Sequence, residues 1–280
     1  MVFSPPPRVC VPYLGYILSP GYDELKQRKK EHYMDELARL IITELKPLSP
    51  NYLSIITVPW LDDVRPFQWN NFKIDLNYTY HIPLDRSLDE IWKSFSKDSR
   101  QRVRAFEERA PKMRESNDID TFYQLLEETY RRQGLSSPII SKEYLRAIIS
   151  KFPEEIKLYY VYIGDEIMDA ELVYVYKNSF KLWLGGMAIR HGVNGGQEYA
   201  TWQLIKNARS AQYKDFEIIG ANTKRLCEYQ SKFNPSLKTY IKISQKDTEG
   251  MIAEFLYKKM IMKTNPITKN HILKPISSPI

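Results

Sequence analysis

Three β-rich segments in the second half of this chain constrain its fold more than any other sequence feature. They are rich in Tyr, Val, Ile and Leu and lie at 156–163, 167–176 and 180–186. Gly164-Asp165 and Lys177-Asn178, which separate them, are typical of tight hairpin turns. The pattern predicts three consecutive antiparallel strands, and the apolar stripe that follows at 197–211 predicts a helix.

The elements around these strands alternate between helix and strand. Before them we expect a strand at 112–116 and two helices, which Asn117 and Ser141 cap. After them come a helix, a strand, a helix and a strand, expected at 197–211, 216–219, 223–232 and 239–243. The predicted order, β-α-α-β-β-β-α-β-α-β, indicates an α/β fold with a mixed sheet.

The first part of the chain has a less regular pattern. The elements expected there are a helix at 23–46 and strands at 52–58 and 74–82. Ser87 and Glu90 form a capping box that opens one or two further helices before Pro111. Because this proline interrupts the helical pattern, we place a boundary there. The expected regions are a domain at 1–110, a domain at 111–246, and a helix with a basic tail at 247–280.

Composition excludes several classes of protein. The 280 residues are 43% hydrophobic and 27% charged, which is typical of a globular chain. No apolar stretch approaches the about 20 residues that a membrane-spanning helix needs, and the N-terminus does not resemble a signal peptide. Two cysteines, Cys10 and Cys227, and four scattered histidines provide neither a disulfide framework nor metal-ligand spacing. We therefore expect a cytoplasmic protein without a bound metal.

The net charge of +7 is concentrated in two segments. Residues 97–114 carry seven basic and three acidic side chains, and residues 238–280 carry eight basic and three acidic ones. Such segments bind nucleic acid, cofactor phosphates or anionic substrates, or are solvated helix faces and a basic tail. Arg100 and Arg104 lie one helical turn apart and share a face. Together with Lys224, they are predicted to bind an anionic substrate.

Several segments resemble the FemAB-like (Fem-type) branch of the GNAT superfamily of acyltransferases. They are PYLGYIL, RPFQWNNF, the linker from Ser87 to Ser116, and DFEIIGANTKRLCEYQSKFNP. The resemblance covers roughly residues 12–244. It implies a GNAT fold with a mixed, partly splayed sheet in the second half of the chain. A shortened GNAT-like domain is expected before it, because family members usually have further elements ahead of the PYLG segment.

The GNAT resemblance also implies where a cofactor binds. Two neighbouring strands of a GNAT sheet splay apart, here 180–186 and 216–219, and the slot accepts an extended thioester arm. The Gly-rich loop 185–196 leads into a helix N-terminus, whose free N–H groups and dipole favour anions. Phosphates of coenzyme A are therefore predicted at Gly192, Asn194, Gly195 and Gly196. The loop departs from the register of the family signature, and a connector that needs glycine only for turning is the alternative.

Acyl transfer to an amine requires a base and an acid. Glu171 lies among apolar neighbours in the central strand and is the predicted general base, the alternative being an outward-facing strand residue. Tyr229 lies where GNAT enzymes often place a tyrosine that protonates the leaving thiolate, the alternative being a core aromatic. Gln230 departs from the Phe-Lys pair common in Fem-like proteins, since it donates hydrogen bonds without charge. Lys232 is expected to point elsewhere on the same helix.

Three functions remain open from the sequence. The favoured one is an N-acyltransferase that transfers an acyl group from acetyl-CoA or another acyl-CoA to an amine of a sugar or small anionic acceptor. Direct attack is expected because no nucleophile–base dyad is present. The second is a Fem-type transferase that uses aminoacyl-tRNA, which the basic segments favour. The third is a non-enzymatic binding protein with a degenerate GNAT fold, which the irregular loop and short first half favour.

Overall fold

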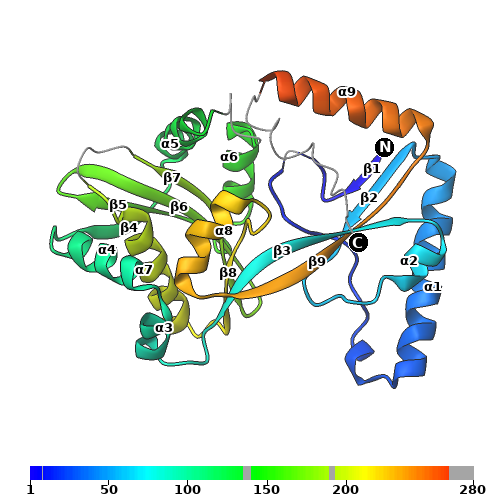
Figure 1. The fold of residues 1–280 in the computed structure, drawn as a ribbon, viewed down its shortest axis with the longest axis horizontal. Coiled ribbons are helices and arrows are strands. Elements are labelled where there is room, and N and C mark those ends of the chain that lie inside the picture. The colour runs from blue at the N-terminus through cyan, green and yellow to red at the C-terminus, as the bar shows by residue number, and fades with distance from the viewer. Residues whose placement is uncertain (8, 135–139, 189–192, 265–280) are drawn as a thin grey trace, which may run out of the picture. The chain divides into compact units, whose positions relative to one another are not determined.

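The computed structural model describes residues 1–7, 9–134, 140–188 and 193–264 (Figure 1). The chain forms two compact units. Of the described residues, the first contains 1–79 and 238–258, and the second contains those of 80–237 and 259–264. The boundary expected near residue 110 therefore falls inside the second unit, which also takes in the helices that begin after Ser87.

The first unit has a small sheet with helices packed on it. Its elements are β1 (Val2–Ser4), η1 (Tyr22–Glu24), α1 (Gln27–Leu45), η2 (Lys46–Leu48), β2 (Tyr52–Ile56), α2 (Arg65–Trp69), most of β3 (Lys73–Pro83) and β9 (Ser236–Lys246), and the start of α9 (Thr248–Thr264). β2 pairs in parallel with β1 and antiparallel with β9. Met34 and Ala38 of α1 and Phe67 of α2 are buried against β2, which gives this unit its own apolar core.

The second unit is built on a mixed sheet. Its strands are β4 (Lys112–Ser116), β5 (Ile156–Ile163), β6 (Glu166–Tyr176), β7 (Ser179–Met187), β8 (Asp215–Ile218) and the last residues of β3. The order is β3-β8-β7-β6-β5-β4, in which β7 and β8 are parallel and the other neighbours antiparallel. The three predicted strands are confirmed, with ends that differ from expectation by at most one residue.

Helices cover both faces of this sheet (Figure 1). They are α3 (Leu88–Ser94), α4 (Lys97–Glu107), α5 (Ile119–Arg132), α6 (Lys142–Lys151), α7 (Gly196–Ser210) and α8 (Lys224–Gln230). On one face, Phe106 of α4 and Leu204 of α7 join a core with Phe216 of β8. On the other, the Tyr160 hydroxyl of β5 donates a hydrogen bond to the Asp118 carbonyl at the start of α5.

Two helix ends differ from the sequence prediction. The N-cap of α5 is Asp118 and not Asn117, because the Asp118 carboxylate accepts a hydrogen bond from the Thr121 N–H, three residues on. Helix α8 ends at Gln230, and a 3₁₀ turn, η3 (Ser231–Phe233), follows it. Lys232 therefore does not lie on the α-helix that carries Tyr229. The Ser87–Glu90 capping box and the Ser141 cap are confirmed.

Candidate active site

The sheet opens between β7 and β8. Their pairing runs from Ser179 to Leu182 on β7, and the Ile219 N–H makes one more hydrogen bond to the Leu182 carbonyl. β7 continues to Met187, where it remains paired with β6. Within the described pairings, residues 183–187 of β7 therefore have no partner on β8. This confirms the expected partly splayed sheet, and such an edge offers backbone groups to an extended ligand.

The side chain of Glu171, on β6, extends over the neighbouring strand β7 beside this opening. It is paired with Gly185, and a Cβ atom at Gly185 would lie 2.7 Å from the Glu171 Oε2 atom. Glycine is thus the residue that leaves room for the carboxylate. Glu171 is only 2% exposed, so the alternative of an outward-facing residue is wrong.

Two further buried carboxyl groups lie near Glu171. Asp169 precedes it on the same face of β6, and Glu198 comes from the first turn of α7; we call these three residues the acidic cluster. Among the described residues, no side chain outside this pair donates a hydrogen bond to Asp169 or to Oε1 of Glu171, so the two carboxyl groups have only each other as side-chain partners there. Burial raises the pKa of Asp169 and of Glu171, and the charge of Asp169 raises the pKa of Glu171 further. The pair therefore binds a proton more tightly than exposed carboxylates do.

The hydroxyl of Tyr229 faces the acidic cluster from α8. Its ring packs edge-on against Phe233 with centroids 5.6 Å apart. The ring is therefore part of the apolar core, as the alternative interpretation of Tyr229 expected. Burial raises the pKa of Tyr229 well above its usual value, and the charges of Glu198, Glu171 and Asp169 raise it further. The hydroxyl consequently keeps its proton at neutral pH. The structure thus brings the predicted base and the predicted acid together.

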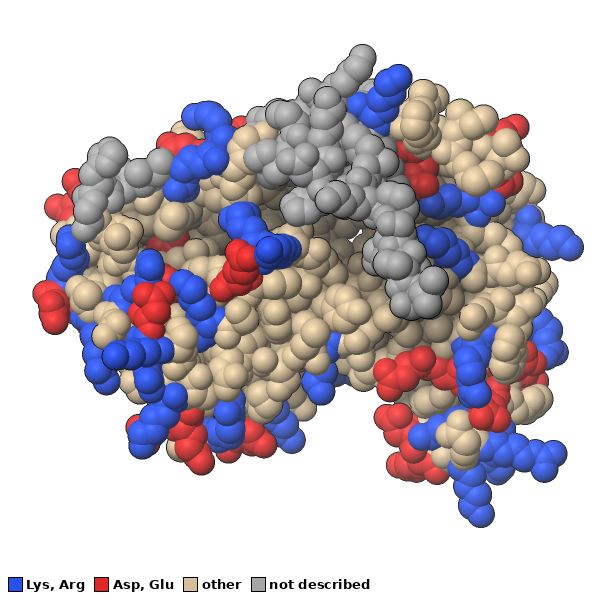
Figure 2. All heavy atoms as spheres, in the orientation of Figure 1, with Lys and Arg blue, Asp and Glu red and all other residues tan. Residues whose placement is uncertain are grey.

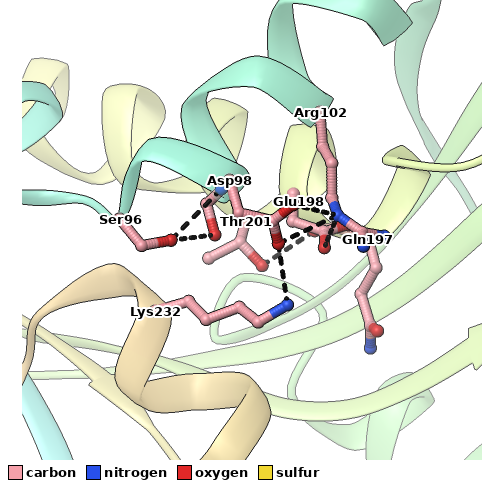
Figure 3. A network of polar contacts seen from close by, with 8 residues as sticks. Ser96, Asp98, Arg102, Gln197, Glu198, Thr201 and Lys232 are labelled. Carbon is pink, nitrogen blue, oxygen red and sulfur yellow. Dashed lines mark hydrogen bonds and ion pairs between the residues drawn. The ribbon is translucent and has the colours of Figure 1, made fainter.

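A network of charged side chains borders the cluster (Figure 3). The Arg102 Nε atom of α4 donates to the Asp98 carboxylate at 3.1 Å and lies 3.9 Å from the Glu198 carboxylate. The Lys232 ammonium also donates a hydrogen bond to Asp98, with its Nζ atom 3.0 Å from Oδ2. These hydrogen bonds lower the pKa of Asp98. Lys232 thus contacts Asp98, whereas Gln230 contacts the Ile219 carbonyl, so the two side chains point to different partners as expected.

Gln230 fixes the turn between β8 and α8. Its amide Nε2 donates to the Ile219 carbonyl at 2.9 Å, and the intervening Gly220 has a φ of 116°. Its Oε1 atom is buried without a hydrogen bond from any described residue. The side chain therefore positions the segment that carries Tyr229.

The predicted substrate-binding residues lie outside the acidic cluster. Arg100 donates to the Lys93 carbonyl of α3, and the Arg104 guanidinium lies 5.9 Å from the Trp92 ring centroid, also on α3. Lys224 is exposed on α8, next to Glu228. Over α3 and α4, basic and acidic side chains alternate on the surface (Figure 2). No described contact joins these three residues to Glu171 or Tyr229.

The predicted phosphate loop is described only in part. Gly192 lies outside the described residues, and Asn194 is exposed. Gly195 is the N-cap of α7 with a φ of 99°, and a Cβ atom there would lie 2.6 Å from the Arg102 carbonyl oxygen. At Gly196 a Cβ atom would meet the Phe106 ring at 3.5 Å, an ordinary contact. Close packing of α7 on α4 therefore accounts for Gly195.

This difference predicts a large effect on stability for one of two neighbouring substitutions and a small effect for the other. Gly195→Ala is expected to lower the free energy of unfolding by about 1–3 kcal/mol, because it strains a left-handed backbone and overlaps a carbonyl of α4. Gly196→Ala adds a methyl group at normal contact distance and is expected to change stability by less than about 1 kcal/mol. Urea unfolding of both variants checks this. Equal stability losses would contradict the packing explanation for Gly195.

Comparison with known proteins identifies the fold. Residues 93–231 match the profile of the family described as acetyltransferase (GNAT) domain. This segment is a GNAT domain. It contains the β7–β8 opening, the acidic cluster and Tyr229. No curated protein gives a significant match to the chain.

Solved structures share the fold of the chain at low sequence identity. FemX is similar with a TM-score of 0.64 and 13% identity, over 82% of this chain and 81% of that one. The C-terminal domain of an Agrobacterium fabrum protein assigned as a lysylphosphatidylglycerol synthetase gives 0.55 and 10%, over 83% and 79%. A Bacteroides thetaiotaomicron protein of unknown function gives 0.55 and 10%, over 75% of both chains. The expected GNAT and Fem-like fold is confirmed.

Two other expectations concern metals and membranes. Among the described residues, no group of three or more His, Cys, Asp or Glu side chains is arranged to hold a metal ion. In the same part of the chain, no helix combines the length and the apolar character that crossing a bilayer requires.

Proposed function

We propose that the GNAT domain transfers an acyl group from a thioester, acetyl-CoA or another acyl-CoA, to an amine of a sugar or similar small anionic acceptor. One observation carries the proposal. A buried glutamate, Glu171, crosses β7 at Gly185 beside the point where β8 leaves β7, and the Tyr229 hydroxyl belongs to the same cluster. A base and an acid thus accompany the strand opening that an extended thioester requires.

The reaction proposed at this site is direct transfer. The neutral amine attacks the thioester carbonyl, and the Glu171–Asp169 pair takes the proton that the amine must lose as the C–N bond forms. The C–S bond then breaks, and the Tyr229 hydroxyl gives its proton to the departing thiolate. The products are an amide and a thiol. To complete the cycle, the carboxyl pair returns its proton to the Tyr229 oxygen. The two groups interact, because the charge of Glu171 contributes to the raised pKa of Tyr229.

The donor is proposed to lie along the free edge of β7, after Leu182. Its phosphates would face the start of α7, at Asn194, Gly195 and Gly196, where no side chain caps the first N–H groups of the helix. Gly185, which leaves room for the Glu171 carboxylate, keeps the reacting end of such a donor next to the base.

Acceptor binding is proposed to use exposed positive charge at the edges of the domain. Arg104 and Lys224 are exposed on α4 and α8, and Arg100 is half-buried one helical turn before Arg104. Long basic side chains on two helices can bind an anionic group without entering the cluster. Their contribution would be to acceptor affinity and not to the chemical step.

A second candidate is a transferase that takes its acyl group from aminoacyl-tRNA. Lys232 favours it. Fem-like proteins commonly have a lysine directly after the aromatic residue, and this chain has Gln230 there. The Lys232 ammonium donates to Asp98, and Arg102, the other partner of Asp98, lies 3.9 Å from Glu198, which supports this proposal. Lys232 would then supply the positive charge that Gln230 lacks.

A purely structural role explains the acidic cluster poorly. Two carboxyl groups buried together without a hydrogen bond from another side chain destabilise the folded protein. A binding protein with a degenerate site has no need to retain Asp169 and Glu171 in this state. Strongly raised carboxyl pKa values beside an open strand edge are instead typical of sites that move protons.

Ligand-dependent stability distinguishes the candidates. Acetyl-CoA at about 100 times its Kd is expected to stabilise the folded protein by about 2.7 kcal/mol, which raises Tm by about 5–10 °C. Aminoacyl-tRNA and uncharged tRNA are the comparison ligands in the same thermal scan. A shift with aminoacyl-tRNA alone would favour the second candidate. No shift with any of these ligands would contradict both transferase proposals.

A further inference from the structure

Glu198 is the member of the acidic cluster that takes no part in the proposed reaction. It lies in the first turn of α7 and is only 5% exposed. The start of α7 packs on β6, because a Cβ atom at Gly196 would lie 3.8 Å from the Asp169 Cβ atom. A third carboxyl group is therefore buried next to the Glu171–Asp169 pair that is proposed to accept the proton.

The surroundings of Glu198 differ from those of the pair. The Arg102 Nε atom lies 3.9 Å from Glu198 Oε1, and the first N–H groups of α7 have no side-chain cap. Both provide positive charge, which favours a carboxylate over a neutral carboxyl group. Among the described residues, Asp169 receives no hydrogen bond from a side chain other than Glu171. The anion of the cluster is therefore expected at Glu198, and the shared proton at the pair.

Arg102 is held in place by both its side chain and its backbone. Its Nε atom donates to both carboxylate oxygens of Asp98 at 3.1 Å, and Asp98 also accepts a hydrogen bond from Lys232 (Figure 3). The hydrogen bond to Asp98 raises the pKa of Arg102. A Cβ atom at Gly195 would lie 2.6 Å from the Arg102 carbonyl oxygen, so α7 begins directly against this residue. Arg102 is thus a fixed cation beside the buried cluster.

We propose that Arg102 is a positioning residue that holds the Glu198 carboxylate ionised beside the Glu171–Asp169 pair, and that this fixed anion sets the pH range in which the pair keeps its proton. Burial is the main reason that the pKa of Asp169 is raised to about 7. The charge of Glu198 adds to this rise, and the charge of Arg132 on α5 opposes it.

Glu198 acts on the tyrosine of the cluster in the same way. Burial is the main cause of the raised pKa of Tyr229, on α8, and the charge of Glu198 is the next. An ionised Glu198 therefore favours the protonated state of both groups that exchange protons. The catalytic meaning of this arrangement rests on the proposed function, whereas its effect on proton binding does not.

The pH dependence of stability tests the proposal without a substrate. The raised pKa of the pair stabilises the folded protein at low pH, and this contribution is lost as the pH rises from about 4.5 through the folded values. Arg102→Gln removes a positive charge, so the cluster binds protons more tightly and the loss is expected about 1 pH unit higher. Glu198→Gln removes a negative charge, and the loss is expected about 1 pH unit lower. Thermal unfolding of the full chain between about pH 4 and about pH 9 measures both shifts.

Further variants test whether Arg102 acts through Glu198. In a chain that already carries Glu198→Gln, Arg102→Gln is expected to shift the curve by at most about half as much as in the parent protein. Arg102→Lys keeps the charge and is expected to restore most of the parent curve. Arg146→Gln on α6, whose partner is Asp120, is the matched control and is expected to leave the curve unchanged above about pH 4.5. Stability losses of equal size at every pH in Arg102→Gln and Glu198→Gln would assign both residues to packing and overturn the proposal.

Kinetics connects the same charges to the reaction. With acetyl-CoA and an amino sugar, the acidic limb of the kcat/KM profile is expected to shift upward in Arg102→Gln and downward in Glu198→Gln, as the stability curves do. Shifted stability curves in a protein that transfers no acyl group would contradict the proposed function and support the inference about Arg102. An active enzyme whose stability curve and pH profile both stay unchanged in these variants would overturn the inference and leave the proposed function intact.

Discussion

Replacing Glu171 by Gln is expected to remove most of the acyl-transfer activity and to make the folded protein more stable. Gln keeps the size and shape of Glu but cannot take a proton from the attacking amine. Loss of a general base typically lowers kcat by about 100- to 10,000-fold. Steady-state kinetics with acetyl-CoA and a panel of amino sugars measures this fall, and the affinity for coenzyme A is expected to stay nearly constant.

The gain in stability follows from the raised pKa of Glu171. Folding raises this pKa above its ordinary value of 4.5, so the folded protein holds the proton more tightly than the unfolded chain. The free energy of unfolding therefore falls as the pH rises from about 4.5 through the folded pKa. The Glu171→Gln substitution removes this loss. The variant is expected to gain about 2–4 °C in Tm at pH 8 for each ~1 kcal/mol recovered, and to match the parent protein near pH 4.

Glu217→Gln is the control for this experiment. Glu217 is as deeply buried, on β8, but its carboxylate accepts a hydrogen bond from the Lys181 ammonium. Breaking a buried ion pair from one side typically costs about 3–5 kcal/mol, so this variant is expected to lose stability at pH 8. If Glu171→Gln lost stability in the same way, or kept full activity, Glu171 would be a structural residue and the proposed base would be wrong.

The sequence was sufficient for the order of the elements in the second unit because local signals there agree. The turns at Gly164-Asp165 and Lys177-Asn178 separate apolar strands, and a polar cap precedes most helices. The inward direction of Glu171 was harder to predict. Residues 168–172 alternate between apolar and acidic, a pattern that in a strand with one solvated face places the acidic residues outside. Because helices cover both faces of this sheet, the acidic residues are buried as well.

The arginines of α4 differ in their surroundings for a physical reason that the sequence contains. Ser99, Val103 and Phe106 form the inward stripe of this helix. Arg102 lies beside that stripe, whereas Arg100 and Arg104 lie on the side that contacts α3. Counting from the apolar stripe identifies Arg102 as the arginine nearest to Glu198. Lys232 required the structure, because its direction depends on where α8 changes into a 3₁₀ turn.

The tyrosine of the acidic cluster provides the second large expected effect. Tyr229→Phe removes only a hydroxyl group, so the ring still packs against Phe233 and the affinity for the donor is expected to remain. Because the thiolate would then leave without a proton donor, turnover is expected to fall about 100- to 10,000-fold. Tyr213→Phe, in a ring that packs against Phe180 away from the cluster, is the matched control and is expected to retain activity.

Gln230→Lys is the companion variant, and it separates the two transferase proposals. A lysine at this position can still donate a hydrogen bond to the Ile219 carbonyl, so the turn after β8 is expected to persist. With an acyl-CoA donor, the new charge offers no benefit at a site whose proton transfers use Glu171 and Tyr229, and turnover should stay equal or fall. With an aminoacyl-tRNA donor, the Fem-like lysine is restored and adds to the charge that Lys232 supplies. A clear rise in tRNA-dependent transfer in this variant would therefore overturn the acyl-CoA proposal, because a positive charge after Tyr229 helps only a reaction that needs it there.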